Sequence, residues 1–234
     1  MKSLLLKCRQ VITISSLTLL VACGGSDNDS SNAIYEVEFA GTWGAVTHPT
    51  NIPPGEFPNP TSAPHFSPIV VATHNAKASL WESGKRASAG TEEISETGNP
   101  TTFLAEADDA IAAGTVHSVV RGEGGFISPG TQKVAIQVNS DFPKVTFLTM
   151  IAPSPDWFAG ARVESLLSDG KLVDTMTVDV LAYDAGTDNG ERYITADDNN
   201  VPRGTIQGLI TDPADTSFSS EAARKIGTLT FTKQ

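Results

Sequence analysis

Two carboxylates four residues apart, Asp184 and Asp188, follow a predicted strand in residues 183–190 (YDAGTDNG). The glycines in this stretch allow a tight backbone curl that points both carboxylates into one small space. Calcium prefers such oxygen ligands, with backbone carbonyls and water completing its shell. The stretch fails the EF-hand pattern, because Gly186 stands where that loop needs an oxygen-bearing side chain. The pattern leaves two interpretations open, a site for a hard cation and a solvated turn.

Motifs typical of catalysis are absent or misplaced. The chain has no G-x-S-x-G, P-loop, G-x-G-x-x-G or H-E-x-x-H pattern. Ser168 and Lys171 match S-x-x-K, but the Asp-Gly pair between them predicts a turn, whereas that chemistry needs a helix. Zinc ligands usually include a close pair, so the irregularly spaced histidines favour polar loop residues over a zinc site. These histidines are His48, His65, His74 and His117.

Residues 150–160 (MIAPSPDWFAG) place an acid between two prolines and two aromatic residues. Pro153 and Pro155 each fix their own φ and restrict the residue before them, which predicts a stiff backbone leading to Asp156. Aromatic residues beside a rigid loop are more often buried than exposed as contacts for a partner. The aromatic residues that we expect in the core are Trp43, Trp81, Trp157 and Phe158.

The pattern of apolar residues predicts a mainly β protein. Runs that alternate apolar and polar residues lie at 35–39, 134–138, 176–180 and the C-terminal end. Residues 145–151 (VTFLTMI) are apolar almost throughout, which predicts a central strand buried on both faces. Residues 102–113 carry apolar side chains on one face, which predicts a helix. Short strands with turn-rich connections favour an antiparallel β-sandwich with one short helix and long loops.

The start of the chain has the features of an export signal. Lys2, Lys7 and Arg9 precede a short apolar run at residues 11–22 (VITISSLTLLVA), and no acidic residue occurs before Asp27. The apolar run is too short to be read as a membrane-spanning helix. We therefore expect residues 1–22 to be a signal peptide.

Residues 20–24 (LVACG) resemble the lipobox of bacterial lipoproteins, in which the cysteine becomes the lipidated first residue of the mature chain. This resemblance assigns lipid to Cys23 and predicts attachment to a membrane, with Gly24 favouring the outer membrane or the cell surface. The alternative is an ordinary secretory signal with an incidental cysteine. Residues 23–33 are polar and are expected to form a flexible tether, so the folded domain is expected at 34–234.

Charge and cysteine content limit the partners of this domain. Removal of residues 1–22 takes away three basic residues and no acid, leaving 13 Lys and Arg against 27 Asp and Glu. Nucleic acid, heparin-like chains and anionic lipid surfaces are poor partners for such an acidic protein. Cys8 lies in the signal and Cys23 in the lipobox, so the domain has no thiol for a disulfide or a thiolate metal site.

Several stretches together resemble the spondin domain, the N-terminal module of F-spondin and mindin. In chain order they are FAGTWGAVTHP (39–49), PHFSPIVVATHN (64–75), LWESGKRASAGTEEISETG (80–98), MIAPSPDWFAG (150–160) and YDAGTDNG (183–190). The resemblance runs in order from about residue 35 to the C-terminus. It implies a C2-like β-sandwich in an extracellular protein that binds calcium and takes part in adhesion.

The same resemblance implies three calcium-binding carboxylates, which fall on Asp156, Asp184 and Asp188. The prolines of the first motif would then deliver Asp156 preorganised to a site whose other acids come from a distant loop. Two function classes follow. One is a surface-anchored, calcium-binding adhesion or ligand-binding module for a protein or glycan of unknown identity. The alternative is a metal-dependent extracytoplasmic hydrolase that uses the acids around Asp156.

Overall fold

A computed structural model describes residues 31–44, 47, 63–191, 193, 195–209, 218 and 222–234. The expected signal peptide at 1–22, Cys23, most of the expected tether and His48 lie outside these residues. The first strand begins at Asn32, so the last two residues of the expected tether belong to the sheet.

The described elements are mostly strands. In chain order they are β1 (Asn32–Gly41), β2 (His65–Phe66), β3 (Val70–His74), α1 (Ala89–Thr97), α2 (Thr101–Ala112), β4 (Val116–Arg121), β5 (Phe126–Ile127), β6 (Gly130–Asn139), β7 (Lys144–Ala152), β8 (Trp157–Val163), β9 (Leu167–Ser168), β10 (Lys171–Leu172), β11 (Thr175–Asp184), β12 (Gln207–Gly208) and β13 (Lys225–Lys233). Among the described residues, no helix has both the length and the apolar character needed to cross a membrane.

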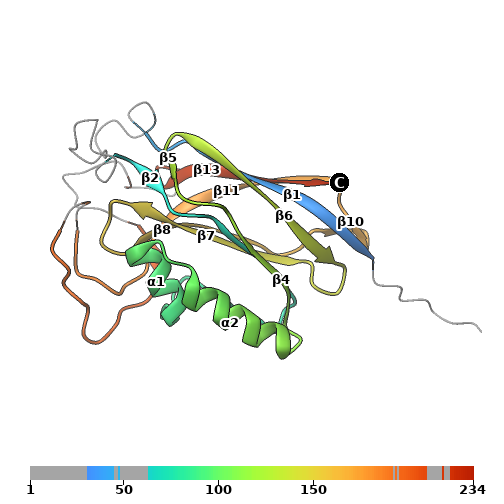
Figure 1. Cartoon of the computed structure of the whole chain (residues 1–234), viewed down its shortest axis with the longest axis horizontal. Coiled ribbons are helices and arrows are strands. Elements are labelled where there is room, and N and C mark those ends of the chain that lie inside the picture. Colours follow the sequence, from blue (N-terminus) through green and yellow to red (C-terminus); the bar gives the residue numbers. More distant parts are fainter. Residues whose placement is uncertain are drawn as a thin grey trace, which may run out of the picture.

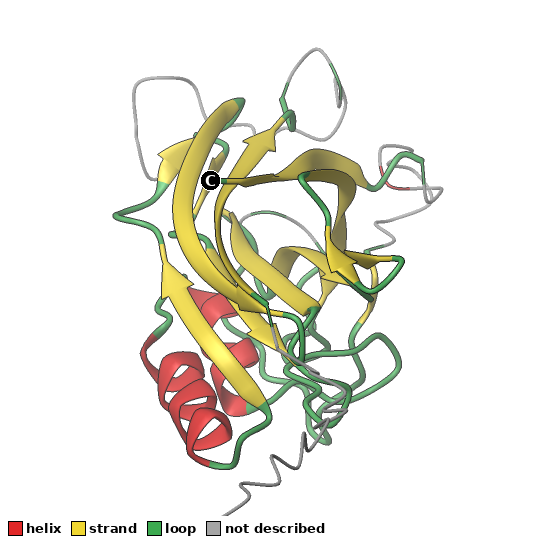
Figure 2. Ribbon diagram, turned by 90° about the vertical axis from the view of Figure 1, so that its right-hand side faces the viewer, coloured by secondary structure: helices red, strands yellow, loops and turns green. Residues whose placement is uncertain are grey.

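The long strands form one antiparallel sheet in the order β4-β3-β7-β8-β11-β13-β1-β6. The sheet curls until its two end strands, β4 and β6, lie in contact, so that it almost closes on itself (Figure 2). Ser168 and Lys171 flank the turn of the β9-β10 hairpin, so the turn expected at the S-x-x-K match is present. The two turn residues, Asp169 and Gly170, both have positive φ. The prediction of a mainly antiparallel, sandwich-like β fold is confirmed.

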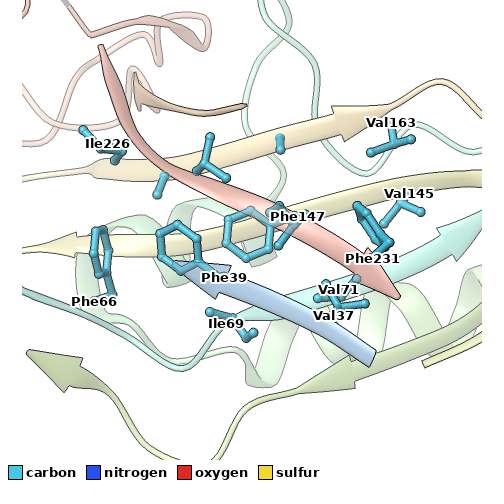
Figure 3. Close-up of a cluster of buried hydrophobic side chains, with 14 of the residues drawn as sticks. Val37, Phe39, Phe66, Ile69, Val71, Val145, Phe147, Val163, Ile226 and Phe231 are labelled. Carbon is cyan, nitrogen blue, oxygen red and sulfur yellow. The ribbon is translucent and has the colours of Figure 1, made fainter. Parts of the chain in front are cut away.

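Alternation along the strands fills the interior of the curled sheet. On β1 the side chains of Tyr35, Val37 and Phe39 are buried, whereas the intervening glutamates are partly exposed. Phe39 lies between Phe66 and Phe147, with both ring centroids 5.0 Å from its own (Figure 3). The four aromatic residues expected in the core, Trp43, Trp81, Trp157 and Phe158, are all buried.

Strand β7 is central and buried on both faces, as its apolar run predicts. One face supplies Phe147 to the interior of the sheet. The other face supplies Leu148 to a smaller cluster that includes Ile94 of α1 and Phe103 of α2. The two helices therefore cover the outer face of the sheet beside β7 (Figure 1). This covering explains why β7 has no polar alternation.

Helix α2 confirms the helix expected at 102–113, but α1 is an addition that the sequence did not indicate. The buried face of α1 consists of Gly90, Thr91, Ile94 and Ser95, so it has no apolar stripe. Its ends are nevertheless well defined. The Ser88 hydroxyl accepts a hydrogen bond from Thr91 N, and Gly98 ends the helix in the left-handed conformation.

The interpretation of the histidines as loop residues is wrong for the three that are described. His65, His74 and His117 lie on β2, β3 and β4. His74 is buried, and its ring nitrogens are within hydrogen-bonding distance of Asn75 O and Thr146 Oγ1, both 2.9 Å away. Desolvation lowers the pKa of His74, which favours a neutral ring with a structural role.

Candidate metal centre

The sheet register brings the three predicted acids together. Strand β8 pairs with β11 so that Trp157 lies opposite Asp184, the last residue of its strand. Asp156 immediately precedes Trp157, and its carbonyl accepts a hydrogen bond from Ala185 N at 3.1 Å. Asp188 follows in the loop after β11. Two segments almost 30 residues apart in the chain therefore meet at one end of a strand pair.

Asp156 is completely buried, and its two carboxylate oxygens differ. Oδ2 accepts hydrogen bonds from Thr187 N at 2.7 Å, Asp188 N at 3.1 Å and Thr187 Oγ1 at 3.3 Å. Oδ1 is buried and has no hydrogen-bond partner within the described part of the chain. Burial raises the pKa of Asp156, and the hydrogen bonds from the other loop oppose this rise.

The other two acids accept hydrogen bonds from the backbone of their own loop. Asp184 Oδ1 accepts from Gly186 N at 2.7 Å. Asp188 uses both oxygens, with Oδ1 accepting from Gly190 N at 2.6 Å and Oδ2 from Asp198 N at 2.8 Å. Burial, followed by the charge of Asp156, raises the pKa of Asp184 to about 7. Loss of solvation is the larger cause, and the neighbouring negative charges add to it.

Gly186 allows the curl that the sequence predicts. Its φ is +74°, and a Cβ at this position would lie 2.9 Å from backbone atoms of Gly204 and Thr205. Gly204 N also donates to Gly186 O at 2.7 Å. A side chain here would be strained by both the conformation and the neighbouring chain, so the loop needs glycine.

The loop before Asp156 is organised by a residue that sequence reasoning missed. The Ser154 hydroxyl donates to Ile151 O at 2.5 Å and accepts from Trp157 N at 3.1 Å. These two bonds close the turn that leads from β7 to β8. Pro155 in turn faces the other loop, because a Cβ on Gly190 would lie 2.7 Å from Pro155 Cβ. The backbone before Asp156, which the prolines are expected to stiffen, therefore packs against the loop that contains Gly190.

Three further residues around the acids were assigned no role from the sequence. Asn200 Nδ2 donates to Gly186 O at 3.2 Å and to Asp188 O at 3.3 Å. Arg203 donates to Thr187 O and pairs with Glu92 of α1. Glu96, also on α1, borders a pocket of about 290 Å³ together with Ser154, Pro155 and Asp188. Only the tertiary fold brings these residues to the two motifs.

The chemistry of this donor set suits a hard cation, although the shell is not fully formed. In the part of the chain that the structure describes, no group of three or more His, Cys, Asp or Glu side chains is arranged so that it could hold a metal ion. Asp184 and Asp188 instead direct oxygens to backbone N–H groups. The unpaired Oδ1 of Asp156 and the mutual repulsion of the acids are the features that calcium would relieve, with backbone carbonyls and water as further ligands.

Comparison with known proteins identifies the family of this chain. The Spondin_N family model matches residues 33–226, which include both loops of the centre. Spondin-1 of Gallus gallus is 30% identical over 195 residues, or 80% of this chain and 22% of the relative, and Spondin-1 of Homo sapiens is 29% identical over the same shares. Spondin-2 of Homo sapiens is 27% identical over 78% of this chain and 55% of the relative. The chain thus spans about a fifth of Spondin-1 and about half of Spondin-2. With most of its length matched, the chain belongs to the spondin N-terminal domain family.

Proposed function

We propose that this protein is an extracellular, calcium-binding adhesion or ligand-binding module, held at a membrane by lipid on Cys23. The observation that carries the calcium proposal is Asp156, a completely buried carboxylate with one unpaired oxygen. A buried carboxylate in a protein is normally paired with a cation or fully hydrogen-bonded, because its desolvation is costly. Asp184 and Asp188 are the other proposed ligands.

The charges around Asp156 support a cation rather than a solvated turn. Asp184 and Asp188 lie close enough for their charges to add to one another, and Asp184 keeps its proton to about pH 7. None of the ion pairs formed among the described residues involves any of these three acids. Calcium would neutralise the acids and join the two loops.

The arrangement favours binding over hydrolysis. Both oxygens of Asp188 and one of Asp184 accept backbone hydrogen bonds within their own loop. Both oxygens of Asp188 are thus poorly placed to take a proton from water, while each keeps a second lone pair that a cation can use. Acids held in place to bind an ion rigidify a surface, which is what a binding module requires.

The partner is proposed to be a protein or glycan, and not nucleic acid. The excess of acidic residues disfavours polyanions as ligands. The chain covers only part of each spondin relative, so the partners of those longer proteins are not carried over to it.

Thermal unfolding of the full-length chain with and without calcium tests the site. After removal of metal with EGTA, addition of calcium at a hundred times Kd should stabilise the wild type by about 2.7 kcal/mol, which corresponds to roughly 5–10 °C in melting temperature. Asp156→Asn and Asp184→Asn should each remove most of this gain. No shift in the wild type, or an equal shift in all variants, would contradict calcium binding at these acids.

Asp184→Asn is the cleaner of the substitutions. It removes a repelling charge while leaving an oxygen to accept from Gly186 N, so the metal-free variant should be at least as stable as the wild type. Asp188→Asn should instead lower the stability of the metal-free protein, because its new amide nitrogen would face one of two backbone N–H groups. Its calcium response therefore has to be compared with its own metal-free form.

The lipid anchor is tested by fractionating cells that express the wild type or Cys23→Ser. Lipoproteins, by the lipobox resemblance, carry several acyl chains, and each buried CH₂ adds about 0.8 kcal/mol of membrane affinity. The wild type should be recovered with membranes and the variant in the soluble fraction. Equal recovery of both with membranes would rule out attachment through this cysteine.

A further inference from the structure

Glu96 is an acid near the centre that neither of the two motifs contains. It lies in the last turn of α1, whose end is fixed by Gly98 in the left-handed conformation. A Cβ on Gly98 would lie 2.8 Å from Ser67 Cβ, so the helix end packs tightly on the chain before β3. The position of Glu96 is therefore set by the fold rather than by a flexible loop.

The surroundings of Glu96 resemble those of Asp156. Its Oε1 is buried and has no hydrogen-bond partner among the described residues. Desolvation raises the pKa of Glu96, and a hydrogen bond with the Thr187 side chain opposes the rise. The nearby Arg203 already pairs with Glu92 and the Thr187 carbonyl, so its charge is shared.

Thr187 joins Glu96 to the centre. Its backbone N–H and hydroxyl both donate to Asp156 Oδ2, at 2.7 and 3.3 Å, and its side chain is near enough to Glu96 to lower the pKa of that acid. Glu96 and Asp188 also line the same pocket of about 290 Å³, in which water can lie between them. Glu96 thus approaches the centre from the helix side, while the three proposed ligands approach from the two loops.

We propose that Glu96 is a fourth acid of the centre, which acts through Thr187 and its own negative charge to strengthen calcium binding. The proposal rests on the proposed function and on two independent observations. One is the fully buried, unpaired oxygen of Asp156, and the other is the unpaired oxygen of Glu96 in the wall of the adjoining pocket. Glu96 is a positioning residue and not a proposed ligand, because it borders the pocket beside Asp188 and acts on the ion through its charge and through Thr187.

The test compares calcium affinities of the full-length chain by titration calorimetry after EGTA treatment. Glu96→Gln keeps the shape of the side chain but loses its negative charge. We expect its Kd to rise about three- to tenfold, because one negative charge beside the pocket that Asp188 also lines would be lost. Glu96→Asp keeps the charge and should restore part of the affinity. Glu123→Gln, an exposed acid outside the centre, removes the same net charge and should leave Kd unchanged.

A merely structural role would change stability and leave Kd alone. Glu96→Gln should melt no lower than the wild type without calcium, because it removes an unpaired buried charge. If Glu96→Gln binds calcium as the wild type does while Asp184→Asn does not, the role of Glu96 is refuted and the calcium site stands. If the wild type itself binds no calcium, the proposed function fails, and the role of Glu96 fails with it.

Discussion

Inside the curled sheet, the ring of Phe39 lies 5.0 Å from the rings of both Phe66 and Phe147, and all three side chains are fully buried. Where β8 begins and β11 ends, the carboxylate of Asp156 is equally buried, and backbone N–H groups of a second loop hold it. Burial stabilises the aromatic cluster, because apolar surface leaves water. The same burial penalises the carboxylate, as its raised pKa records.

This difference indicates which region responds to solution conditions. The aromatic cluster has no group that titrates or binds metal, so its contribution to stability should not depend on pH or calcium. The acid loops are ordered by hydrogen bonds to carboxylates that repel one another. Their order should therefore change with proton or cation concentration. The three predictions that follow test this separation, from the largest expected effect to the smallest.

The largest effect is expected from Phe147→Ala, which removes a ring from the centre of the interior (Figure 3). Loss of a fully buried phenylalanine destabilises by about 3–5 kcal/mol, because a cavity remains beside Phe39. Urea unfolding should give the same loss with and without calcium. A loss confined to one of the two conditions would show that the interior and the acid loops are coupled. The proposed independence of the two regions would then be wrong.

The two regions also differ in how far the sequence predicted them. Alternation on β1 and the apolar run of β7 indicated strands and their burial, because side-chain period and burial are local properties. Helix α1 was missed, since its buried face is made of small and polar residues that fit against a neighbour known only from the fold. The strand positions of three histidines were also missed, because they depend on pairing partners that only the fold shows.

For the centre, local spacing indicated that Asp184 and Asp188 share a loop, while Asp156 was assigned by family resemblance. Their meeting depends on the register that sets Trp157 opposite Asp184, a long-range pairing that no local pattern encodes. Ser154 and Glu96 could not be foreseen, because each takes its role from the hydrogen bonds and burial of the folded chain.

A smaller effect is expected when the pH of the metal-free protein is changed. The folded state holds the proton of Asp184 up to a pKa of about 7, whereas the unfolded chain releases it near the ordinary value of 3.8. Between these values the folded state binds more protons, so stability falls as pH rises from about 4 to 7 and levels off above. Thermal melts of the wild type and Asp184→Asn across this range should show the fall attenuated in the variant.

The comparison with Asp184→Asn is needed because other groups titrate in the same range. The pKa of His74 is lowered in the folded state, so its contribution rises with pH and has the opposite sign. Calcium should raise the stability of the wild type most at pH 7 and above, where the deprotonated acids bind it best, and should thereby oppose the fall. Identical pH curves for the wild type and the variant would show that Asp184 ionises as it does in the unfolded chain.

The smallest effect is expected from Pro155→Ala, which separates two sources of order in the loop before Asp156. The proline fixes φ and contacts Gly190 of the other loop, but Asp156 is also held by its hydrogen bonds to Thr187 and Asp188. If those bonds order the loop, alanine costs only about 0.4–1 kcal/mol of stability, chiefly by freeing the unfolded chain, and calcium affinity falls less than about threefold. Calorimetry on metal-free and calcium-loaded protein measures both quantities. A tenfold or greater loss of calcium affinity at unchanged metal-free stability would contradict this expectation. It would mean that the proline, rather than the hydrogen bonds to the carboxylate, holds Asp156 in position for the ion. The acid loops would then be ordered more by their backbone than by charge.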